Sequence, residues 1–271
     1  MNALLWLLLP VAAASGWWLA RRLPARRDGR SIHTTPAYFR GLNYLLNEEP
    51  DKAIDVFVQL LEVDSETVET HLALGSLFRR RGEVERAIRI HQNLIARPAL
   101  DEEHRASALL ELGKDYMRAG LYDRAENLFL ELKEMKQHVR KALENLLVIY
   151  QQEKDWQACL DVSEELQPLV REPLGLARAH YYCELAEEAL ARGDNREAES
   201  LLERAVVADP QNIRPRHLQA RMARERGDCQ NAISQLRRIA ERNPDYISEI
   251  LPDLHKCHAM RGDLAGLREY L

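Results

Sequence analysis

The sequence lacks the features that identify an enzyme or a disulfide-stabilised secreted protein. Its four cysteines lie 24, 46 and 28 residues apart and include no CxxC pair. This spacing fits no disulfide framework or metal site, and it favours a reducing compartment. No GxSxG, Walker, GxGxxG or HExxH motif is present, and the acidic residues are scattered. We therefore expect a protein that is not an enzyme and that holds no cofactor or metal in this chain.

Glycine, proline and aromatic residues are also scarce, with 12 glycines, 11 prolines and 6% aromatic residues. The remainder is rich in Ala, Leu, Glu and Arg, whose side chains lose little rotamer freedom on a helix. Runs of β-branched residues that alternate with polar ones, as in strands, are missing. The composition predicts an all-α protein.

Charge is unevenly distributed along the chain. The net charge is −5, yet residues 1–30 carry five arginines against a single aspartate, so the remaining body is acidic. Binding to nucleic acid requires a basic face on the folded domain that neutralises phosphates. We therefore expect no nucleic acid among the partners.

The first segment, residues 1–20, contains no charged side chain and is long enough to span a bilayer as a helix. Trp17 and Trp18 would lie at the headgroup layer, and Arg21 and Arg22 follow at once. The pattern predicts a single-pass transmembrane anchor whose N-terminus is on the outer side, because basic residues favour the cytoplasmic side. Residues 21–36 then read as a basic juxtamembrane linker, whose arginines either contact anionic lipids or only set the topology.

Two alternatives for this segment remain open, a buried helix and a cleaved signal peptide. The sequence Ala12-Ala13-Ala14 is similar to a cleavage site, and cleavage would give a periplasmic or secreted repeat protein. Against cleavage, no basic residue precedes the apolar run.

An internal repeat runs through residues 37–271. A small residue recurs at intervals of 34 to 39, at Ala53, Ala87, Ala125, Cys159, Ala198 and Ala232, with Leu267 as a weaker match. Aromatic residues and turn glycines recur in step with it. A period near 34 is typical of tetratricopeptide hairpins, whose small residues let two helices approach closely. We therefore predict a right-handed superhelical solenoid of six to seven such hairpins, because a single hairpin cannot bury its apolar face.

The predicted units are residues 37–70, 71–106, 107–142, 143–178, 179–215, 216–249 and 250–271. The last is incomplete, so we expect either that the natural sequence continues beyond Leu271 or that this form is truncated.

In such an array the first helix of each hairpin lines a groove that binds peptides. The residues that the repeat register places there are Asn43, Arg79, Lys114, Arg118, Gln151, His180, Arg221 and Arg224. Arg79, Lys114 and Arg118 would form a basic patch suited to carboxylates of a partner. The alternative is a solvated helix face with local ion pairs. The run Arg79-Arg80-Arg81-Gly82-Glu83 is either a dedicated charged contact or a solvated helix end, with its cations near the negative pole of the helix dipole.

Two further clusters are more consistent with packing than with chemistry. His255 and His258 share one helical face, but a structural zinc site needs about four protein ligands and this face supplies two. Cys159 occupies the small-residue position of its repeat, and Cys183 near His180 gives only a weak indication of a reactive thiolate.

The sequence resembles the lipopolysaccharide assembly protein B family. The resemblance covers essentially the whole chain and is clearest in LLPVAAASGWWLARR (8–22), LALGSLFRRRGEVERAIRIHQNL (72–94), LGKDYMRAGLYDRAENLF (112–129) and HYYCELA (180–186). It implies a bacterial inner-membrane protein with cytoplasmic repeats. It also implies an adaptor that helps the membrane protease FtsH degrade LpxC, the deacetylase of lipid A synthesis. A scaffold that gathers lipopolysaccharide synthesis and transport proteins is the alternative.

One feature of that family is missing from this chain. Family members carry a rubredoxin-like metal domain with paired CxxC motifs after the repeats, and no CxxC occurs here. A metal site therefore cannot be assigned to any residue of this sequence.

Overall fold

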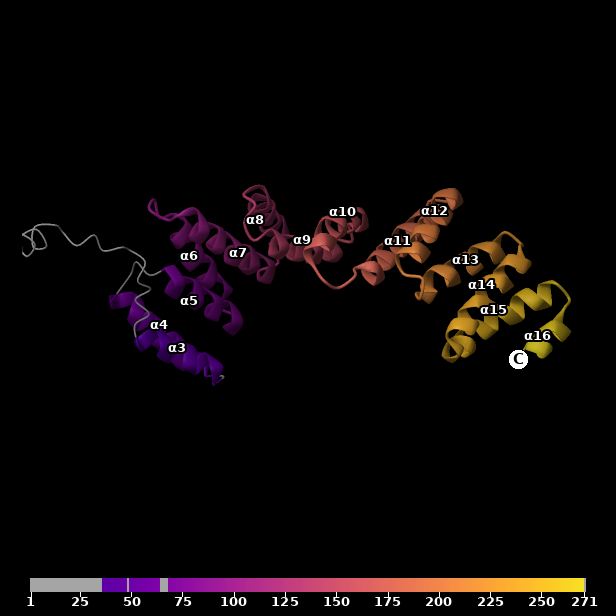
Figure 1. Ribbon diagram of the computed structural model, residues 1–271, viewed down its shortest axis with the longest axis horizontal. Coiled ribbons are helices and arrows are strands. Elements are labelled where there is room, and N and C mark those ends of the chain that lie inside the picture. Colours follow the sequence, from indigo (N-terminus) through magenta and orange to yellow (C-terminus); the bar gives the residue numbers. More distant parts are fainter. Residues whose placement is uncertain (1–35, 48, 64–67, 271) are drawn as a thin grey trace, which may run out of the picture. The chain divides into compact units, whose positions relative to one another are not determined.

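The computed structural model describes residues 36–47, 49–63 and 68–270 (Figure 1). The predicted anchor with Trp17, Trp18, Arg21 and Arg22 lies outside these residues, as does nearly all of the predicted linker. Within the described ranges, no helix has the length and apolar character needed to cross a membrane. The chain divides into two units between Val63 and Asp64, and each is described by itself.

The first unit is a single hairpin of α3 (Pro36–Leu46) and α4 (Pro50–Val63). The second unit contains six hairpins. Their helices are α5 (Val68–Arg81), α6 (Val84–Ile95), α7 (Glu102–Arg118), α8 (Tyr122–Glu134), α9 (Val139–Glu153), α10 (Trp156–Leu166), α11 (Gly175–Ala191), α12 (Asn195–Ala208), α13 (Ile213–Glu225), α14 (Cys229–Arg242), α15 (Ile247–Met260) and α16 (Leu264–Tyr270). Short 3-10 turns, η1 (Gln167–Leu169) and η2 (Pro244–Tyr246), follow α10 and α14.

Each helix of the second unit packs against the next along the chain, so the hairpins stack in sequence order. The described residues contain helices and no strand. The prediction of an all-α array of tetratricopeptide-type hairpins is therefore confirmed.

The recurring small residues lie where the two helices of a hairpin meet. All six alanine or cysteine positions are fully buried, and Leu267 is 5% exposed. Cys159 is thus a packing residue, and burial raises the pKa of its thiol to about 12. Close helix contact at these positions explains why the repeat is visible in the sequence.

The turns inside the six hairpins of the second unit each contain a residue in the left-handed conformation. Glycine supplies it in five of them, at Gly82, Gly120, Gly193, Gly227 and Gly262, with φ between 69° and 89°. Between α9 and α10 the same place is taken by Lys154, with φ 61°. An L side chain pays a steric penalty there that glycine avoids.

In the second unit the first helices begin three to five residues before the predicted unit starts, from Val68 rather than residue 71 up to Ile247 rather than 250. Two of these helix starts are fixed by capping side chains. Asp101 accepts a hydrogen bond from the backbone N–H of His104 at 2.9 Å, and Asn212 accepts one from Arg214 at 3.1 Å. Such caps satisfy N–H groups that a helix start leaves without partners.

Candidate functional site

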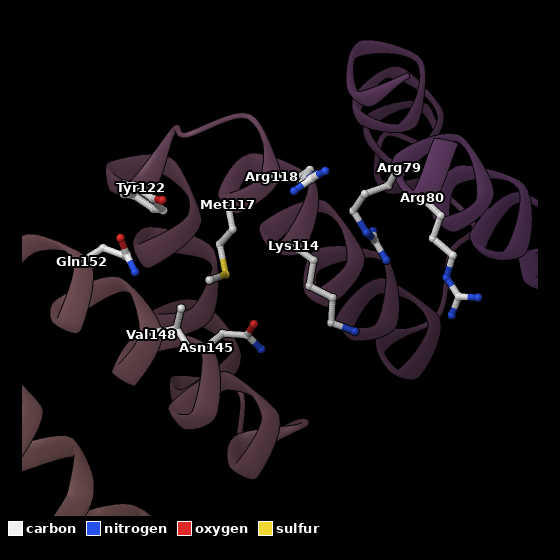
Figure 2. Close-up of a pocket in the computed structure, with 9 residues that line it drawn as sticks. All are labelled: Arg79, Arg80, Lys114, Met117, Arg118, Tyr122, Asn145, Val148 and Gln152. Carbon is white, nitrogen blue, oxygen red and sulfur yellow. The ribbon is translucent and has the colours of Figure 1, made fainter. Parts of the chain in front are cut away.

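A groove of about 570 Å³ lies in the second unit between the first helices of three successive hairpins (Figure 2). Its lining comes from α5, α7, α8 and α9. The lining residues are Arg79, Arg80, Lys114, Met117, Arg118, Tyr122, Asn145, Val148 and Gln152.

The groove is basic. Four of its lining residues are cations, namely Arg79 and Arg80 on α5 and Lys114 and Arg118 on α7, and no carboxylate is among them. Figure 2 shows the two α7 cations between the α5 arginines and the residues of α9. The structure therefore brings Arg79, Lys114 and Arg118 together, as the repeat register predicts, in a body that is otherwise acidic.

Arg79 is held by two carboxylates of α7. Its guanidinium donates to Asp115 at 2.6 Å and to Glu111 at 2.5 Å. Glu111 also accepts from Lys114 at 2.6 Å and from the Ser76 hydroxyl at 3.0 Å. Burial would raise the pKa of Glu111, but the hydrogen bonds from Lys114 and Arg79 outweigh it and lower the pKa to about 2. Glu111 is therefore ionised at neutral pH, and it neutralises part of the charge of both cations.

Behind Arg79 lies a fully buried pair, His91 of α6 and Asp115 of α7. The His91 Nδ1 and Asp115 Oδ2 atoms are 2.5 Å apart, while the other carboxylate oxygen accepts from Arg79. Both oxygens of Asp115 are thus engaged. The chain of contacts runs from the core between two hairpins to the wall of the groove, so it fixes where the Arg79 guanidinium lies.

Arg80 and Arg118 differ from their neighbours. Both are exposed, and neither forms an ion pair or hydrogen bond with any other described residue. They lie seven residues before the small residues Ala87 and Ala125, so they occupy equivalent positions on successive first helices. These two guanidinium groups are the cations of the groove that remain available to a ligand.

The rest of the lining is apolar or amide in character. Val148 is 43% exposed, Met117 and Tyr122 are half-buried, and Asn145 and Gln152 carry side-chain amides. The groove can therefore offer charge-assisted hydrogen bonds to anions next to apolar contact and amide hydrogen bonds.

The other predicted groove residues lie elsewhere. Asn43 is exposed on α3 in the first unit. Gln151 donates to the Tyr181 hydroxyl, and a His180 ring nitrogen lies 2.8 Å from the Arg214 guanidinium. These contacts join neighbouring first helices.

Arg221 and Arg224 of α13 also contact neighbouring first helices. Arg221 lies 3.7 Å from Glu187 of α11, and Arg224 forms an ion pair with Asp253 of α15. Neither residue lines the basic groove.

The sequence reasoning missed most of the groove lining outside the predicted basic patch. The sequence prediction includes Arg80 only as part of a charged run. Its signal was present, however, because Arg80, Arg118 and Gln152 all lie seven residues before a small residue. Lys114 and Val148 likewise share the position eleven residues before. Comparison of equivalent positions in successive repeats therefore predicts Arg80, Gln152 and Val148 as lining residues.

The histidines near the C-terminal end separate in the structure. His258 is buried, and His255 is exposed. Over the residues that the structure describes, no three His, Cys, Asp or Glu side chains are grouped as a metal site would require.

Comparison with known families identifies the repeat type. Models of the tetratricopeptide repeat match residues 70–106 and 183–247. A crystal structure of the C-terminal part of a TPR repeat-containing protein from Cytophaga hutchinsonii superposes with a TM-score of 0.53 at 12% identity, covering 86% of this chain and 90% of that one. At this identity the likeness shows the fold alone.

Curated relatives are similar over the whole chain. Lipopolysaccharide assembly protein B of Escherichia coli K12 is 41% identical over 272 residues, which cover all of this chain and 70% of that protein. The Haemophilus influenzae protein of the same name is 37% identical over 281 residues, with the same coverage. The chain belongs to the lipopolysaccharide assembly protein B family.

Proposed function

We propose that this protein is a membrane-anchored cytoplasmic adaptor that restrains lipopolysaccharide synthesis. In this role it promotes the degradation of the deacetylase LpxC by the membrane protease FtsH. The observation that carries the proposal is the solvent-open basic groove in a chain of this family. A stacked array with such a groove suits the binding of protein segments.

An adaptor of a membrane protease has to remain near the bilayer. Residues 1–20 have the length and apolar character of a transmembrane anchor, and the arginines that follow favour a cytoplasmic position for the repeats. The proposed location is therefore the bacterial inner membrane, with a single pass and a periplasmic N-terminus. Deleting residues 1–22 should abolish the regulation, and normal regulation by the shortened chain would contradict the membrane-bound scheme.

The groove supports binding rather than catalysis. Its cations are arginines and a lysine, and the nearest buried acid and imidazole, Asp115 and His91, are committed to each other and to Arg79. Neither side chain lines the groove. Recognition of a partner is therefore the chemistry that these residues serve best.

The experiment that tests the proposal measures the half-life of LpxC in cells that contain the protein, lack it, or have it restored. We expect the half-life to lengthen on depletion and to return on restoration. An unchanged half-life would contradict the adaptor role. If lipopolysaccharide synthesis and transport proteins then still co-purified with the chain, the protein would be a scaffold without a role in proteolysis.

A further inference from the structure

We propose that the occupant of the basic groove is an acidic segment of a partner protein, in which carboxylates flank an apolar side chain, and that Arg80 and Arg118 bind those carboxylates. This inference rests on the proposed adaptor function and adds the class of ligand and the side chains that recognise it.

The first argument is the unequal state of the four cations. Arg79 and Lys114 already bind the α7 carboxylates Glu111 and Asp115 at 2.5 to 2.6 Å. Arg80 and Arg118 have no such partner among the described residues and are exposed to solvent. A ligand carboxylate can therefore pair with either of these two arginines without displacing a carboxylate of the protein. Because guanidinium groups bind carboxylates with two parallel hydrogen bonds, two such sites also orient the ligand.

The second argument is the chemistry of the remaining lining. Val148 and Met117 present apolar surface beside the cations. Gln152 presents an amide, and Asn145 presents an amide whose nitrogen also donates to the Lys141 carbonyl oxygen at 2.6 Å. Apolar surface favours a side chain, and amides can bind the backbone N–H and C=O groups of an extended chain. A flat anionic membrane surface would contact rim cations but would leave this recessed lining unused. The combination thus favours a peptide over a lipid bilayer.

The third argument concerns Arg79, which we assign as a positioning residue. The Arg79 guanidinium donates through Nη1 to Asp115, which also contacts the buried His91, and through Nη2 to Glu111. This arrangement neutralises the centre of the groove wall and places α5 and α7 in a fixed relation. Arg80 on α5 and Arg118 on α7 are then presented at a set separation, which a preorganised binding site requires.

The test uses the full chain in detergent micelles and a random-peptide phage library. One selection uses the native chain, and a parallel one uses the double variant R80E/R118E. A third uses R171E, because Arg171 is exposed in the loop before α11, forms no ion pair with a described residue and does not line the groove. Both substituted groove positions are exposed, so the double variant should keep its circular-dichroism spectrum and unfolding midpoint.

We expect the native chain and R171E to enrich peptides in which Asp or Glu flanks an apolar residue. The same peptides, synthesised with a fluorescent label, should bind R80E/R118E at least about tenfold more weakly, which corresponds to about 1.4 kcal/mol. Replacing their acids by the matching amides should weaken binding to the native chain similarly. Enriched peptides without acids, equal binding by R80E/R118E, or no enrichment would each overturn the proposal.

Inorganic phosphate distinguishes a phosphate site from a carboxylate site. We expect phosphate to release the bound peptides only as much as chloride does at the same ionic strength, because both then act by screening. Release at far lower phosphate concentration would mean that the groove binds phosphate groups, as on a lipid headgroup, and would overturn the peptide assignment.

This inference and the adaptor function can fail separately. If LpxC half-life lengthens on depletion but R80E/R118E restores it as well as the native chain, the groove assignment is wrong and the adaptor role stands. If acidic peptides bind as expected and LpxC half-life does not change on depletion, the groove assignment stands and the adaptor role is wrong.

Discussion

Two neighbouring junctions in the second unit share one geometry and differ in chemistry. Where α5 and α6 meet α7, the ring of His91 packs on Gly75, and where α7 and α8 meet α9, the ring of Phe129 packs on Gly113. In each case the ring lies four residues after the small residue of its hairpin, and the glycine twelve before it.

The following hairpin places a different kind of residue against each ring. His91 meets the buried carboxylate of Asp115, whereas Phe129 belongs to an apolar cluster that includes Ile149, the residue at the position equivalent to Asp115. Buried polar and charged pairs contribute little net stability compared with packed apolar groups, because removing such groups from water is costly. This polar junction of His91 and Asp115 is the one whose contacts extend to Arg79 in the groove.

The largest effect should come from breaking the polar junction on one side. Asp115→Ala leaves His91 buried and removes one partner of Arg79, so we expect the free energy of unfolding to fall by about 3–5 kcal/mol. Urea denaturation followed by circular dichroism measures it. The double variant H91F/D115I copies the apolar junction and should recover most of the loss, since both buried polar groups are replaced together. A double variant as unstable as D115A would contradict this account.

The converse substitution, Phe129→His, places an imidazole in the apolar cluster without a carboxylate opposite it. We expect a loss of about 3 kcal/mol, from the unsatisfied polar group and the smaller ring. The pair F129H/I149D should be less damaging than the sum of its single variants. Strict additivity of the two losses would show that the two junctions are not interchangeable.

Glu111 should make the free energy of unfolding depend on pH, because its pKa is lowered in the folded protein from 4.5 to about 2. The unfolded chain binds this proton more readily, so the stabilisation is complete above about pH 4.5 and is lost as the pH falls toward 2. We expect Glu111→Gln to cost about 2 kcal/mol at neutral pH and progressively less in acid. The exposed Glu85→Gln is the matched control and should show no such trend. Parallel pH profiles for E111Q and the native chain would contradict this prediction.

The smallest expected effect is the difference in stability lost when a methyl group is added at each of the two glycines. A Cβ on Gly75 would lie 2.4 Å from His91 Nε2, and one on Gly113 would lie 2.7 Å from the Phe129 ring. Each ring has to move, which we expect to cost about 1–2 kcal/mol after the better helix propensity of alanine is included. Gly75→Ala should cost more, because the shifted imidazole also loses Asp115. Thermal unfolding of the two variants measures the difference. An equal loss of stability would mean that the contact between His91 and Asp115 contributes little to stability.

The hairpins were predictable from sequence because their main constraint is repeated. Close contact at Ala87, Ala125 and their equivalents requires a small side chain in every hairpin, and five of the turns require glycine. The Lys154 turn was not predictable in this way, because the surrounding structure imposes a left-handed conformation that lysine alone does not favour.

The groove was predictable only in part, because exposure and pairing depend on contacts between hairpins. The register placed Arg79, Lys114 and Arg118 on one surface, but the sequence could not reveal which of them pairs with Glu111 or Asp115. Those acids lie on the following hairpin from Arg79, more than thirty residues away. The same dependence explains why Arg221 and Arg224 pair with neighbouring helices rather than line the groove.

The turn chemistry also has a mechanical consequence. At three of the described hairpins a left-handed glycine is followed at once by a capping aspartate, namely Gly193-Asp194, Gly227-Asp228 and Gly262-Asp263. Each pair ends one helix and starts the next within two residues. Such turns leave little freedom for the angle inside a hairpin. Bending of the second unit would then be concentrated in the joints between hairpins, where a connecting loop and packed side chains join one hairpin to the next. The His91–Asp115 contact spans one of these joints, so it would act as a stiffener that limits how far the groove can open under load.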